Sequence, residues 1–417
     1  MITRLIIKIS DKLKPILVKL FPKKLLSAIK RKTMVRMFQE MKQYQMLPYE
    51  KERFSYGINL IGNIKAETGL GQSCRLVANL LEQSKIPFEI YFYDSLAGTS
   101  NIDTTWDDKI TNKLLYGINL FHINPNELGA AYTKLDKKVW EYHYNIGFWL
   151  WELEEFPEEW TPCFNLFHEI WTPSEFISEA LRKKTKKPVK TMPYYVTAEV
   201  DKSVGREFFS LPKDKFLFLM MYDSASITER KNPMDVIKAF KMAFSPQDTN
   251  VGLVIKLKAN SLEEEKMLQN ELKGYENIYF VKEILTKPQV GSLLQCVDVF
   301  VSLHRAEGFG LVMAEAMLLG TPVIATNWSA NTEFMNEKVA CMVDYTLVKL
   351  EKDYGPFKKG QRWAQPKLEQ VVEYMKLLYG NPEKRKEYSL QGKKMLESSL
   401  GLEITSNKIK ERMKEIV

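Results

Sequence analysis

Short apolar runs alternate with amphipathic stretches along the first half of the chain, and the runs have the length of buried strands. Strands are predicted at residues 56–62, 88–93, 118–123, 144–149 and 169–172. A loop at 63–71 follows the first strand, and apolar spacing predicts a helix at 72–83. Because strands and helices alternate, this half is predicted to form a parallel, doubly wound α/β sheet.

The alternation begins again after Pro193. Strands are predicted at 216–222, 251–257, 278–281 and 297–303, with helices at 233–244 and 288–296. The chain is therefore predicted to hold two Rossmann-like domains, joined near residues 195–210, that face a cleft lined by the carboxyl ends of their strands. The predicted boundaries are 1–50 for an N-terminal arm, 51–200 and 201–390 for the domains, and 391–417 for a C-terminal helix that packs back on the first domain.

Residues 305–326, RAEGFGLVMAEAMLLGTPVIAT, predict a loop, a helix, a turn and a strand. Apolar residues recur there at three- and four-residue spacing, as on one helix face: Val312, Ala316 and Leu319, with Met313 and Met317 beside them. The helix is predicted to begin near Leu311, and Gly320 and Pro322 end it before a strand at 323–326.

Composition sets the class of protein. A chain of 417 residues with 45% hydrophobic and 27% charged residues is globular and long enough for two or three domains. The four cysteines lie far apart and form no CxxC pair, so they indicate neither a zinc site nor a disulfide framework: Cys74, Cys163, Cys296 and Cys341. A reducing, cytosolic compartment fits this usage.

The basic charge is concentrated at the N-terminus. Residues 1–42 hold twelve Lys or Arg and two acids, a net charge of +10, so the formal +8 of the whole chain leaves −2 for the rest. One face of residues 1–20 is apolar (Ile2, Leu5, Ile6, Ile9, Leu13, Ile16, Leu20) and another is cationic (Arg4, Lys8, Lys12, Lys19). This pattern predicts an in-plane amphipathic helix on an anionic membrane surface, divided by Pro15 and Pro22.

Other interpretations of the arm are weighed against this one. The lysines interrupt it too often for a signal peptide or a spanning helix, and no run elsewhere reaches about 18 apolar residues. The arm could instead pack on the protein's own surface with solvated lysines. Nucleic-acid binding is disfavoured because the arm has almost no aromatic residues to stack on bases.

Two segments are candidates for binding an anion. Gly69 and Gly71 precede the helix predicted at 72–83, where backbone N–H groups can approach a phosphate, although such a turn also serves simple strand-to-helix packing. Arg230 and Lys231 precede Pro233, which suits the first turn of a helix. The helix dipole disfavours cations there, so they indicate a bound anion such as a diphosphate, unless they are solvated surface cations.

Glu307 and Glu315 stand eight positions apart, one in a glycine-containing loop and one in the predicted helix. A carboxylate that accepts two hydrogen bonds suits a vicinal diol, so one could hold sugar hydroxyls and the other a ribose. Alternatively, both are acids near a helix N-terminus that favour its dipole.

This arrangement resembles the E-x7-E signature of the family-4 (group 1) retaining glycosyltransferases, which have the GT-B fold of two Rossmann-like domains. The resemblance runs from about residue 56 to the C-terminus. WLWELEEFPEEW, EIWTPSEFISEAL and ERKNP are similar to the subgroup that builds bacterial surface polysaccharides. It implies a hexosyltransferase that moves a sugar from a nucleotide-sugar donor to a lipid-linked or glycan acceptor, in the cytoplasm at the inner face of the cell membrane.

The resemblance also implies roles for residues. Glu307 contacts the donor sugar and Glu315 the ribose, while Arg230 and Lys231 neutralise the diphosphate. The backbone of further segments is implied to bind the donor: Gly308, Phe309, Gly310 and Leu311 at phosphate and sugar, Gly69, Leu70 and Gly71 from the other domain, and Glu283 to Leu285 at the base.

The sequence departs from the family pattern at two places. Many members carry an Arg five residues before the phosphate-binding Lys, where this chain has Ser226. Many also carry a His after the fourth or fifth N-terminal strand, where this chain reads NIGFWLWEL and places Trp149, Trp151 and Glu152 at the expected site. Glu152 is a candidate catalytic group or a cap of local structure. His122 and His143 lie nearby in sequence, and each is either catalytic or a structural hydrogen-bonding residue.

No DxD triplet occurs, so no bound metal or other cofactor is expected. The leaving diphosphate would then be stabilised by Arg230, Lys231 and helix N-termini. In the front-face mechanism that the family implies, the leaving phosphate takes the acceptor proton and no protein base is needed. Two alternatives stay open: a sugar-nucleotide epimerase of the same architecture, and a non-catalytic glycosyltransferase-like partner subunit.

Overall fold

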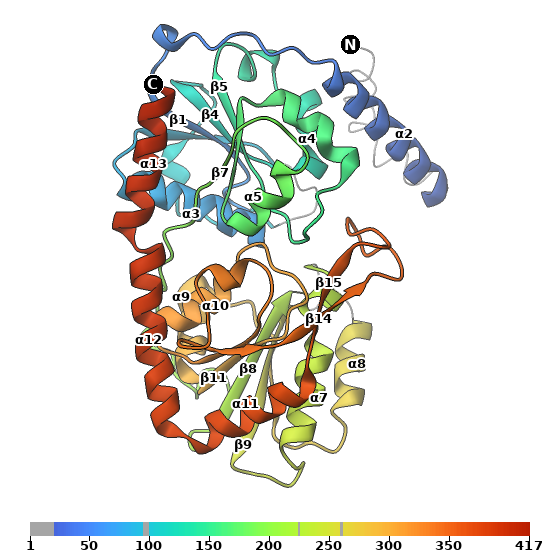
Figure 1. Cartoon of the computed structure of the whole chain (residues 1–417), viewed down its shortest axis with the longest axis vertical. Helices are drawn as coiled ribbons and strands as arrows, with labels where there is room; N and C mark the ends of the chain where they lie inside the picture. The colour runs from blue at the N-terminus through green and yellow to red at the C-terminus, as the bar shows by residue number, and fades with distance from the viewer. Residues whose placement is uncertain (1–20, 95–99, 224–225, 259–261) are drawn as a thin grey trace. The chain divides into compact units, whose positions relative to one another are not determined.

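The computed structural model describes residues 21–94, 100–223, 226–258 and 262–417 (Figure 1). Contacts divide the chain into two compact units. Unit 1 comprises Met1–Trp151, Glu155–Tyr195 and Leu402–Val417, and unit 2 comprises Glu152–Glu154 and Val196–Gly401. Each unit is built around a parallel sheet with helices beside it, so the predicted α/β fold of two Rossmann-like domains is confirmed.

In the described part of unit 1, seven parallel strands are arranged in the order β3-β2-β1-β4-β5-β6-β7. Their bounds are β1 (Ser55–Gly62), β2 (Phe88–Phe92), β3 (Ile110–Thr111), β4 (Tyr116–His122), β5 (Tyr144–Phe148), β6 (Glu169–Thr172) and β7 (Val189–Thr191). The strand order reverses between β1 and β4, which is the switch point where the carboxyl ends of strands leave room for a ligand.

The helices of unit 1 are α2 (Lys23–Lys42), α3 (Gly69–Gln83), α4 (Pro125–Lys134), α5 (Glu175–Arg182) and α13 (Leu402–Ile416), with 3-10 turns η1 (Lys51–Arg53), η2 (Asp107–Lys109), η3 (Lys137–Val139) and η4 (Glu158–Leu166). Three buried amides cross the middle of the sheet: Asn59 donates to Asn119 at 2.8 Å, and Asn119 donates to Asn145 at 3.0 Å. Because these residues are aligned in register, the ladder satisfies polar groups inside the sheet.

Helix α3 begins three residues earlier than predicted, at Gly69 instead of Gln72. Thr68 caps it, because its Oγ1 accepts a hydrogen bond from the N–H of Gly71 at 3.2 Å. A Cβ on Gly71 would collide with the carbonyl oxygen of Ala66, so this position requires glycine. The Gly69–Gly71 segment is therefore the first turn of the helix and not part of a preceding loop.

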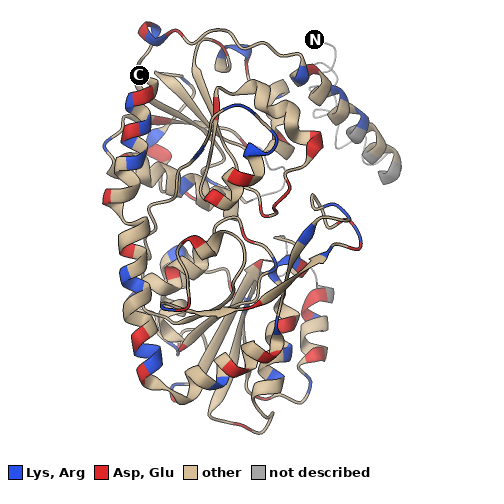
Figure 2. Cartoon of the chain, in the orientation of Figure 1, with Lys and Arg blue, Asp and Glu red and all other residues tan. Residues whose placement is uncertain are grey.

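The last turns of α2 pack on unit 1, where Met37 and Met41 are buried and the Asn165 amide donates to the carbonyl of Met41. Its earlier residues Leu25 and Ile29 are exposed, and Lys and Arg lie along the same helix (Figure 2). The amphipathic face predicted for residues 2–20 lies outside the described residues. Within the described ranges, no helix is long and apolar enough to cross a membrane.

The polar C-terminal tail is helical as predicted, but Gly401 divides it into α12 (Pro382–Leu400) of unit 2 and α13 of unit 1. Arg412 of α13 pairs with the fully buried carboxylate of Glu169, with Nε 3.1 Å from Oε1. Trp171 Nε1 donates to the same carboxylate at 2.6 Å. These hydrogen bonds compensate the buried charge and fix α13 to the sheet of unit 1.

In the described part of unit 2, six parallel strands follow the order β10-β9-β8-β11-β12-β13. They are β8 (Phe216–Asp223), β9 (Val251–Lys258), β10 (Ile278–Val281), β11 (Val299–Ser302), β12 (Val323–Thr326) and β13 (Cys341–Val343). The helices are α6 (Thr228–Lys231), α7 (Pro233–Ala243), α8 (Leu262–Glu271), α9 (Lys287–Cys296), α10 (Leu311–Leu318), α11 (Leu368–Gly380) and α12, with the turn η6 (Ala330–Glu333). The switch point of this sheet lies between β8 and β11.

Two features of unit 2 differ from the predicted pattern. The segment after β13 forms an antiparallel hairpin, β14 (Tyr345–Lys349) and β15 (Arg362–Pro366), which was not predicted. Helix α10 has no single apolar stripe, because all residues from Met313 to Met317 are buried between the sheet, α9 and α12. The buried carboxylate of Glu315 therefore lies inside the unit.

Candidate active site

The carboxyl ends of β8 and β11 lie side by side at the switch point of unit 2, and the segments that follow them carry the predicted site residues. Arg230 and Lys231 follow β8 in α6, and Glu307 follows β11 in the loop before α10. The parallel pairing of β8 with β11 thus brings together side chains that are 76 residues apart in the chain.

Glu307 lies at the centre of this cluster. Its Oε1 is 3.2 Å from Nη1 of Arg230 and also accepts a hydrogen bond from Nζ of Lys231. The Glu307 side chain is only 12% exposed. Burial alone would raise its pKa, but the charges of Lys231, Arg230 and His304 lower the pKa of Glu307 to about 2. Glu307 is therefore an ionised carboxylate at neutral pH.

The guanidinium of Arg230 is fixed by the backbone around it. Nη1 donates to the carbonyl of Ala306 at 2.9 Å and Nε donates to that of Ser226 at 3.3 Å. Glu152 is also close, with its Oε1 3.9 Å from Nη2 of Arg230. Four charged side chains named as catalytic candidates are thus brought together in unit 2: Glu307, Arg230, Lys231 and Glu152.

The two cations directly precede α7, which begins at Pro233 as predicted, and the short helix α6 that contains them was not predicted. Arg230 and Lys231 lie in the last turn of the short helix α6, and Asn232, with φ of 56°, separates them from α7. The Asn232 side chain donates to the Leu303 carbonyl at 3.0 Å, which holds this break in the helix. The N-terminus of α7 disfavours the cations, and Glu307 supplies the negative charge that compensates them. They are not solvated surface cations, because Arg230 is buried and Lys231 is bonded to Glu307.

Backbone strain is present around the same cluster. Ile227, which precedes α6, has φ of 65° and ψ of 99°, and Ser329 has φ of 74° and ψ of −157°. Ser329 Oγ accepts the N–H of Glu307 at 2.9 Å. Such conformations of non-glycine residues cost about 1–3 kcal/mol each and gather at functional sites. The strain fits a cluster whose geometry is imposed by the surrounding fold.

The glycine-containing loop leads directly into α10. Gly310 has φ of 94° and is the N-cap position of the helix, so Leu311 opens α10. A Cβ on Gly310 would lie 2.6 Å from Cε of Met313. Gly308 and Phe309 are buried in the same loop, and the Phe309 ring is 5.6 Å from that of Phe334. The N-terminus of α10 is therefore held beside Glu307, where its dipole favours an anion.

Glu315 lies one turn into α10, and its carboxylate is 2% exposed. Its Oε1 accepts a hydrogen bond from Nζ of Lys287, the first residue of α9. Burial raises the pKa of Glu315, and Lys287 opposes part of this rise. Glu283 and Leu285, predicted at the base, lie between β10 and α9, where Glu283 is exposed and Leu285 is half-buried.

The remaining predicted donor residues belong to unit 1. Gly69, Leu70 and Gly71 form the first turn of α3, beyond the carboxyl end of β1. Their N–H groups lie at a helix N-terminus, as an anion site requires, and their proposed contact with the donor stays a prediction.

Trp149 and Trp151, which sequence placed at the expected site, lie in the aromatic core. Trp149 is fully buried, and its ring packs against Phe156 and Phe164. Trp151 donates its indole N–H to the carbonyl of Glu155 at 3.0 Å. Neither ring is therefore available to a ligand, and of this segment only Glu152 joins the cluster.

Both candidate histidines are held in structural contacts. His122, at the carboxyl end of β4, has its Nε2 2.7 Å from Ser73 Oγ, and burial lowers its pKa to about 4, so it is neutral. His143 precedes β5 and therefore lies at the amino end of the strands, with its ring 4.1 Å from Phe54. His143 thus lies at the edge of the sheet opposite the one where ligands bind in such folds.

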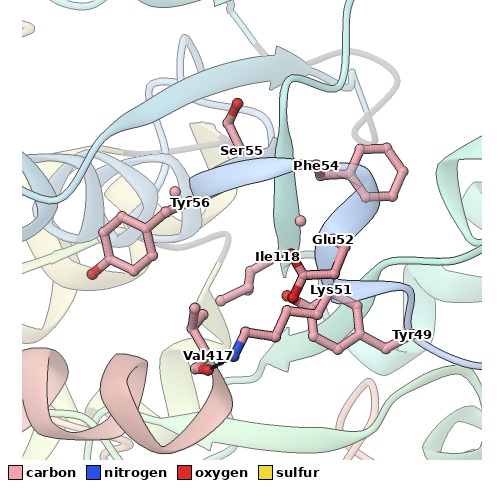
Figure 3. Close-up of a pocket in the computed structure, with 10 residues that line it drawn as sticks. Tyr49, Lys51, Glu52, Phe54, Ser55, Tyr56, Ile118 and Val417 are labelled. Atoms are coloured by element: carbon pink, nitrogen blue, oxygen red, sulfur yellow. Dashed lines mark hydrogen bonds between the residues drawn. The ribbon is translucent and has the colours of Figure 1, made fainter.

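A pocket of about 200 Å³ in unit 1 lies at this opposite edge (Figure 3). Phe54, Tyr56 and Ile118 from the amino ends of β1 and β4 line it, and Lys51 Nζ donates to the carbonyl of Val417. The predicted site lies at the carboxyl ends of the strands, whereas this pocket lies at their amino ends, so the two are different.

Sequence reasoning missed residues that support the site, namely Lys287, Ser329 and Arg305. Arg305 Nη2 donates to Oε1 of Gln365 in β15 at 2.8 Å. The backbone N–H of Arg305 donates to the carbonyl of Arg230, also at 2.8 Å. The RAEGFG segment contains Arg305, but nothing in the sequence indicated the unpredicted hairpin that it contacts.

Comparison with known proteins shows that this chain is similar to glycosyltransferases. Residues 204–395 match the model of the family described as glycosyl transferases group 1. The O-antigen biosynthesis glycosyltransferase WclY of Escherichia coli is 29% identical over 124 residues, which are 29% of this chain and 31% of that protein. The match therefore spans about a third of the length of this curated relative.

Solved structures share the fold over most of the chain. A glycosyltransferase from Rickettsia africae has a TM-score of 0.64 at 12% identity, covering 87% of this chain and 98% of that one. HepE from Anabaena, in complex with UDP and glucose, has a TM-score of 0.60 at 13% identity, covering 87% and 100%. These structures establish the GT-B fold class, and the family match falls on the unit that holds Glu307 and Glu315. Residues 204–395, which include the Glu307 cluster, are therefore similar to the glycosyl transferases of group 1.

Proposed function

We propose that this protein is a retaining glycosyltransferase that moves a sugar, a hexose, from a nucleotide-sugar donor to a lipid-linked or glycan acceptor in cell-surface polysaccharide synthesis. The observation that carries the proposal is the cluster of Glu307, Arg230 and Lys231 at the switch point of unit 2. In open α/β sheets this is where ligands bind. The Escherichia coli relative, described as an O-antigen glycosyltransferase, supports the choice of acceptor class.

The cluster suits a reaction in which a diphosphate leaves. Arg230 and Lys231 would bind the donor diphosphate together with the N-terminus of α10, which begins after Gly310. Negative charge grows on the leaving group as the glycosidic bond breaks, and fixed cations stabilise it without reorganising. Arg230 is already held by the carbonyls of Ala306 and Ser226. Little further conformational entropy is therefore lost when Arg230 binds the diphosphate during the reaction.

The carboxylates have separate proposed roles. Glu307 would accept hydrogen bonds from hydroxyls of the donor sugar, and Glu315 would accept them from the ribose. Glu152, the second carboxylate near Arg230, is a proposed catalytic group on the basis of that proximity. The leaving phosphate would take the acceptor proton on the same face of the sugar, which retains the anomeric configuration. With two cations and a helix N-terminus in place, we propose that the reaction requires no metal ion.

The proposed acceptor places the protein in the cytoplasm, at the inner face of the cell membrane. The net charge of +10 in residues 1–42 would attract the arm to anionic lipid. The exposed residues Phe21, Leu25 and Ile29 would add apolar contact with the interface.

The proposed function is tested by incubating the full-length protein with UDP-, GDP- and dTDP-sugars, with and without a bacterial membrane extract as acceptor source. The expected result is sugar transferred to the extract, and no transfer by a Glu307→Gln control. Epimerised donor would show the alternative enzyme class. Neither product, with any donor, would indicate a non-catalytic partner subunit.

A further inference from the structure

The buried acid Glu315 is paired with a cation that stands in an unfavourable place. Lys287 is the first residue of α9, and its Nζ donates to Oε1 of Glu315 in α10. A positive charge in the first turn of a helix opposes the helix dipole. The Lys287 side chain is 34% exposed, whereas Glu315 is 2% exposed. Two features of the pair are therefore unfavourable: the charge of Glu315 is buried, and the charge of Lys287 opposes the dipole of α9.

The backbone of Lys287 is held firmly. Thr286 forms a capping box with Gln289, in which the Gln289 side chain accepts the Thr286 N–H at 2.9 Å. Ser292 Oγ donates to the carbonyl of Pro288 at 3.0 Å, one residue after Lys287. Because the start of α9 is fixed in this way, the position of the ammonium relative to α10 is fixed too.

Stability alone does not account for the pair, because well-packed apolar residues in place of a buried ion pair are often neutral or stabilising. The carboxylate oxygen of Glu315 that Lys287 does not bind indicates a function for the pair. Lys287 occupies Oε1, and Oε2 has no hydrogen-bond partner among the described residues. Within the same ranges, Lys287 is the charged group that opposes the effect of burial on the pKa of Glu315. One oxygen of the Glu315 carboxyl group therefore stays available to a hydroxyl donor.

We infer that Lys287 is a positioning residue, which holds Glu315 as an oriented carboxylate whose free oxygen accepts a hydroxyl of the donor's ribose. The inference rests on the proposed function, in which Glu315 binds the ribose. The positioning role means that the contribution of the ribose 2′-hydroxyl to nucleotide binding depends on Lys287.

The test is calorimetric titration of UDP, GDP and their 2′-deoxy counterparts into full-length protein from about pH 6 to about pH 9. Wild type is expected to prefer the better-bound ribonucleotide over its 2′-deoxy form by about tenfold, the effect of one lost hydrogen bond to a charged group. In Lys287→Met the carboxyl of Glu315 loses its cation, so its pKa rises further. The preference should be lost near neutral pH and return as the pH rises and the carboxyl ionises. Lys287→Arg should keep the preference.

Two further variants separate positioning from general damage. Glu315→Gln should show no preference at any pH, and adding Lys287→Met to it should weaken binding no further. Lys241→Met is the matched control, because Lys241 is 31% exposed and pairs with Glu271, 37% exposed, at 3.2 Å on the surface of the same unit. It should bind both nucleotides like wild type.

The outcomes distinguish this inference from the proposed function. A wild type that binds nucleotide but ignores the 2′-hydroxyl, or a Lys287→Met variant with the wild-type preference and pH profile, would overturn the inference alone. A wild type that binds none of the nucleotides would overturn both. A melting temperature for each variant confirms that it is folded.

Discussion

At the scale of single residues, Glu307 explains how two cations can be held inside unit 2. Arg230 and Lys231 both bond to its carboxylate, which is ionised because their charges hold its pKa at about 2. The lowered pKa means that this pairing stabilises the fold above the usual pKa of a glutamate, and the stabilisation is lost as the pH falls toward 2. A diphosphate would compete with Glu307 for the same cations.

This competition gives a prediction for Glu307→Gln. The variant keeps the size of the side chain but loses its charge, so turnover should fall by at least about a hundredfold, because the donor sugar loses the ionised acceptor that orients its hydroxyls. UDP or GDP should nevertheless bind at least as tightly as to wild type, because Arg230 and Lys231 are released to meet the diphosphate. Steady-state transfer rates and nucleotide titration measure the two effects. Wild-type turnover, or nucleotide binding that is lost together with turnover, would contradict the assigned role.

Two glycines of α3 offer a matched comparison. A Cβ on Gly71 would collide with the Ala66 carbonyl oxygen, whereas a Cβ on Gly69 would meet nothing within 4 Å. Gly71→Ala should therefore lower the melting temperature by several degrees, an effect of about 1–3 kcal/mol. Gly69→Ala should leave it unchanged within about 1 °C, because an exposed site tolerates the added methyl group. Equal melting temperatures for the two variants would show that the first turn of α3 is not held as described.

Some contacts of the candidate site could be predicted from the sequence, and others could not. Glu307, Arg230 and Lys231 could be grouped because each follows a strand whose carboxyl end was predicted at the same sheet edge. The contact of Lys287 with Glu315 could not, since it depends on how α9 packs beside α10. Trp149 was misplaced because a Trp after a strand suits a core as well as a site, and only packing distinguishes them.

At the scale of elements, the apolar pattern predicted strands best. β6, β10 and β12 have the predicted bounds. β10 shows why, because its sequence IYFV is a continuous apolar run of the kind that a buried parallel strand requires. The β14–β15 hairpin was missed because its strands are short and partly exposed and its tip is charged, so no apolar run marks it. The start of α3 was misplaced because Thr68 caps the helix ahead of two glycines.

The packing of helix α2 limits which truncations can test membrane binding by the N-terminal arm. Its last turns are buried in unit 1 through Met37 and Met41, so removal of residues 1–45 would expose apolar surface. Removal of residues 1–20 leaves this packing intact. The shorter truncation, combined with Leu25→Glu and Ile29→Glu on the exposed part of α2, should fold, bind nucleotide and lose affinity for anionic vesicles.

Co-sedimentation with anionic and with neutral vesicles measures this effect. Each basic residue near the surface contributes roughly 1 kcal/mol, so full-length protein should bind anionic vesicles at low salt and be released as salt rises. Neutral vesicles serve as the control for apolar contact alone. Full-length protein that ignores anionic vesicles, or a truncated variant that binds them equally, would mean that the arm has another role.

At the scale of the whole molecule, sequence predicted two Rossmann-like domains, and both sheets have the doubly wound order. The alternation of strand and helix was sufficient for this, because parallel strands require crossover helices. It could not predict that the tail is divided at Gly401 between the two units, because helical periodicity continues on both sides. Anchoring of α13 by Arg412 and Glu169 is likewise a tertiary contact with no local signal.

We predict that sugar transfer by the whole protein does not require a metal ion. Transfer should continue at the wild-type rate in the presence of EDTA, because Arg230 and Lys231 would supply the positive charge that stabilises the leaving diphosphate. The rate is measured with and without chelator, and Mg²⁺ or Mn²⁺ is added back in a parallel sample. Loss of activity with EDTA and its rescue by either ion would contradict the metal-free mechanism.

The reaction at the Glu307 cluster can be tested with an NMR time course of the full-length protein, a nucleotide-sugar donor and a membrane-derived acceptor. We expect the donor to be consumed and the new glycosidic linkage to have the anomeric configuration of the donor. We also expect Glu307→Gln to form this linkage at least about a hundredfold more slowly. An inverted linkage would contradict the retaining mechanism, and a Glu307→Gln variant as fast as wild type would contradict the location of the reaction at this cluster.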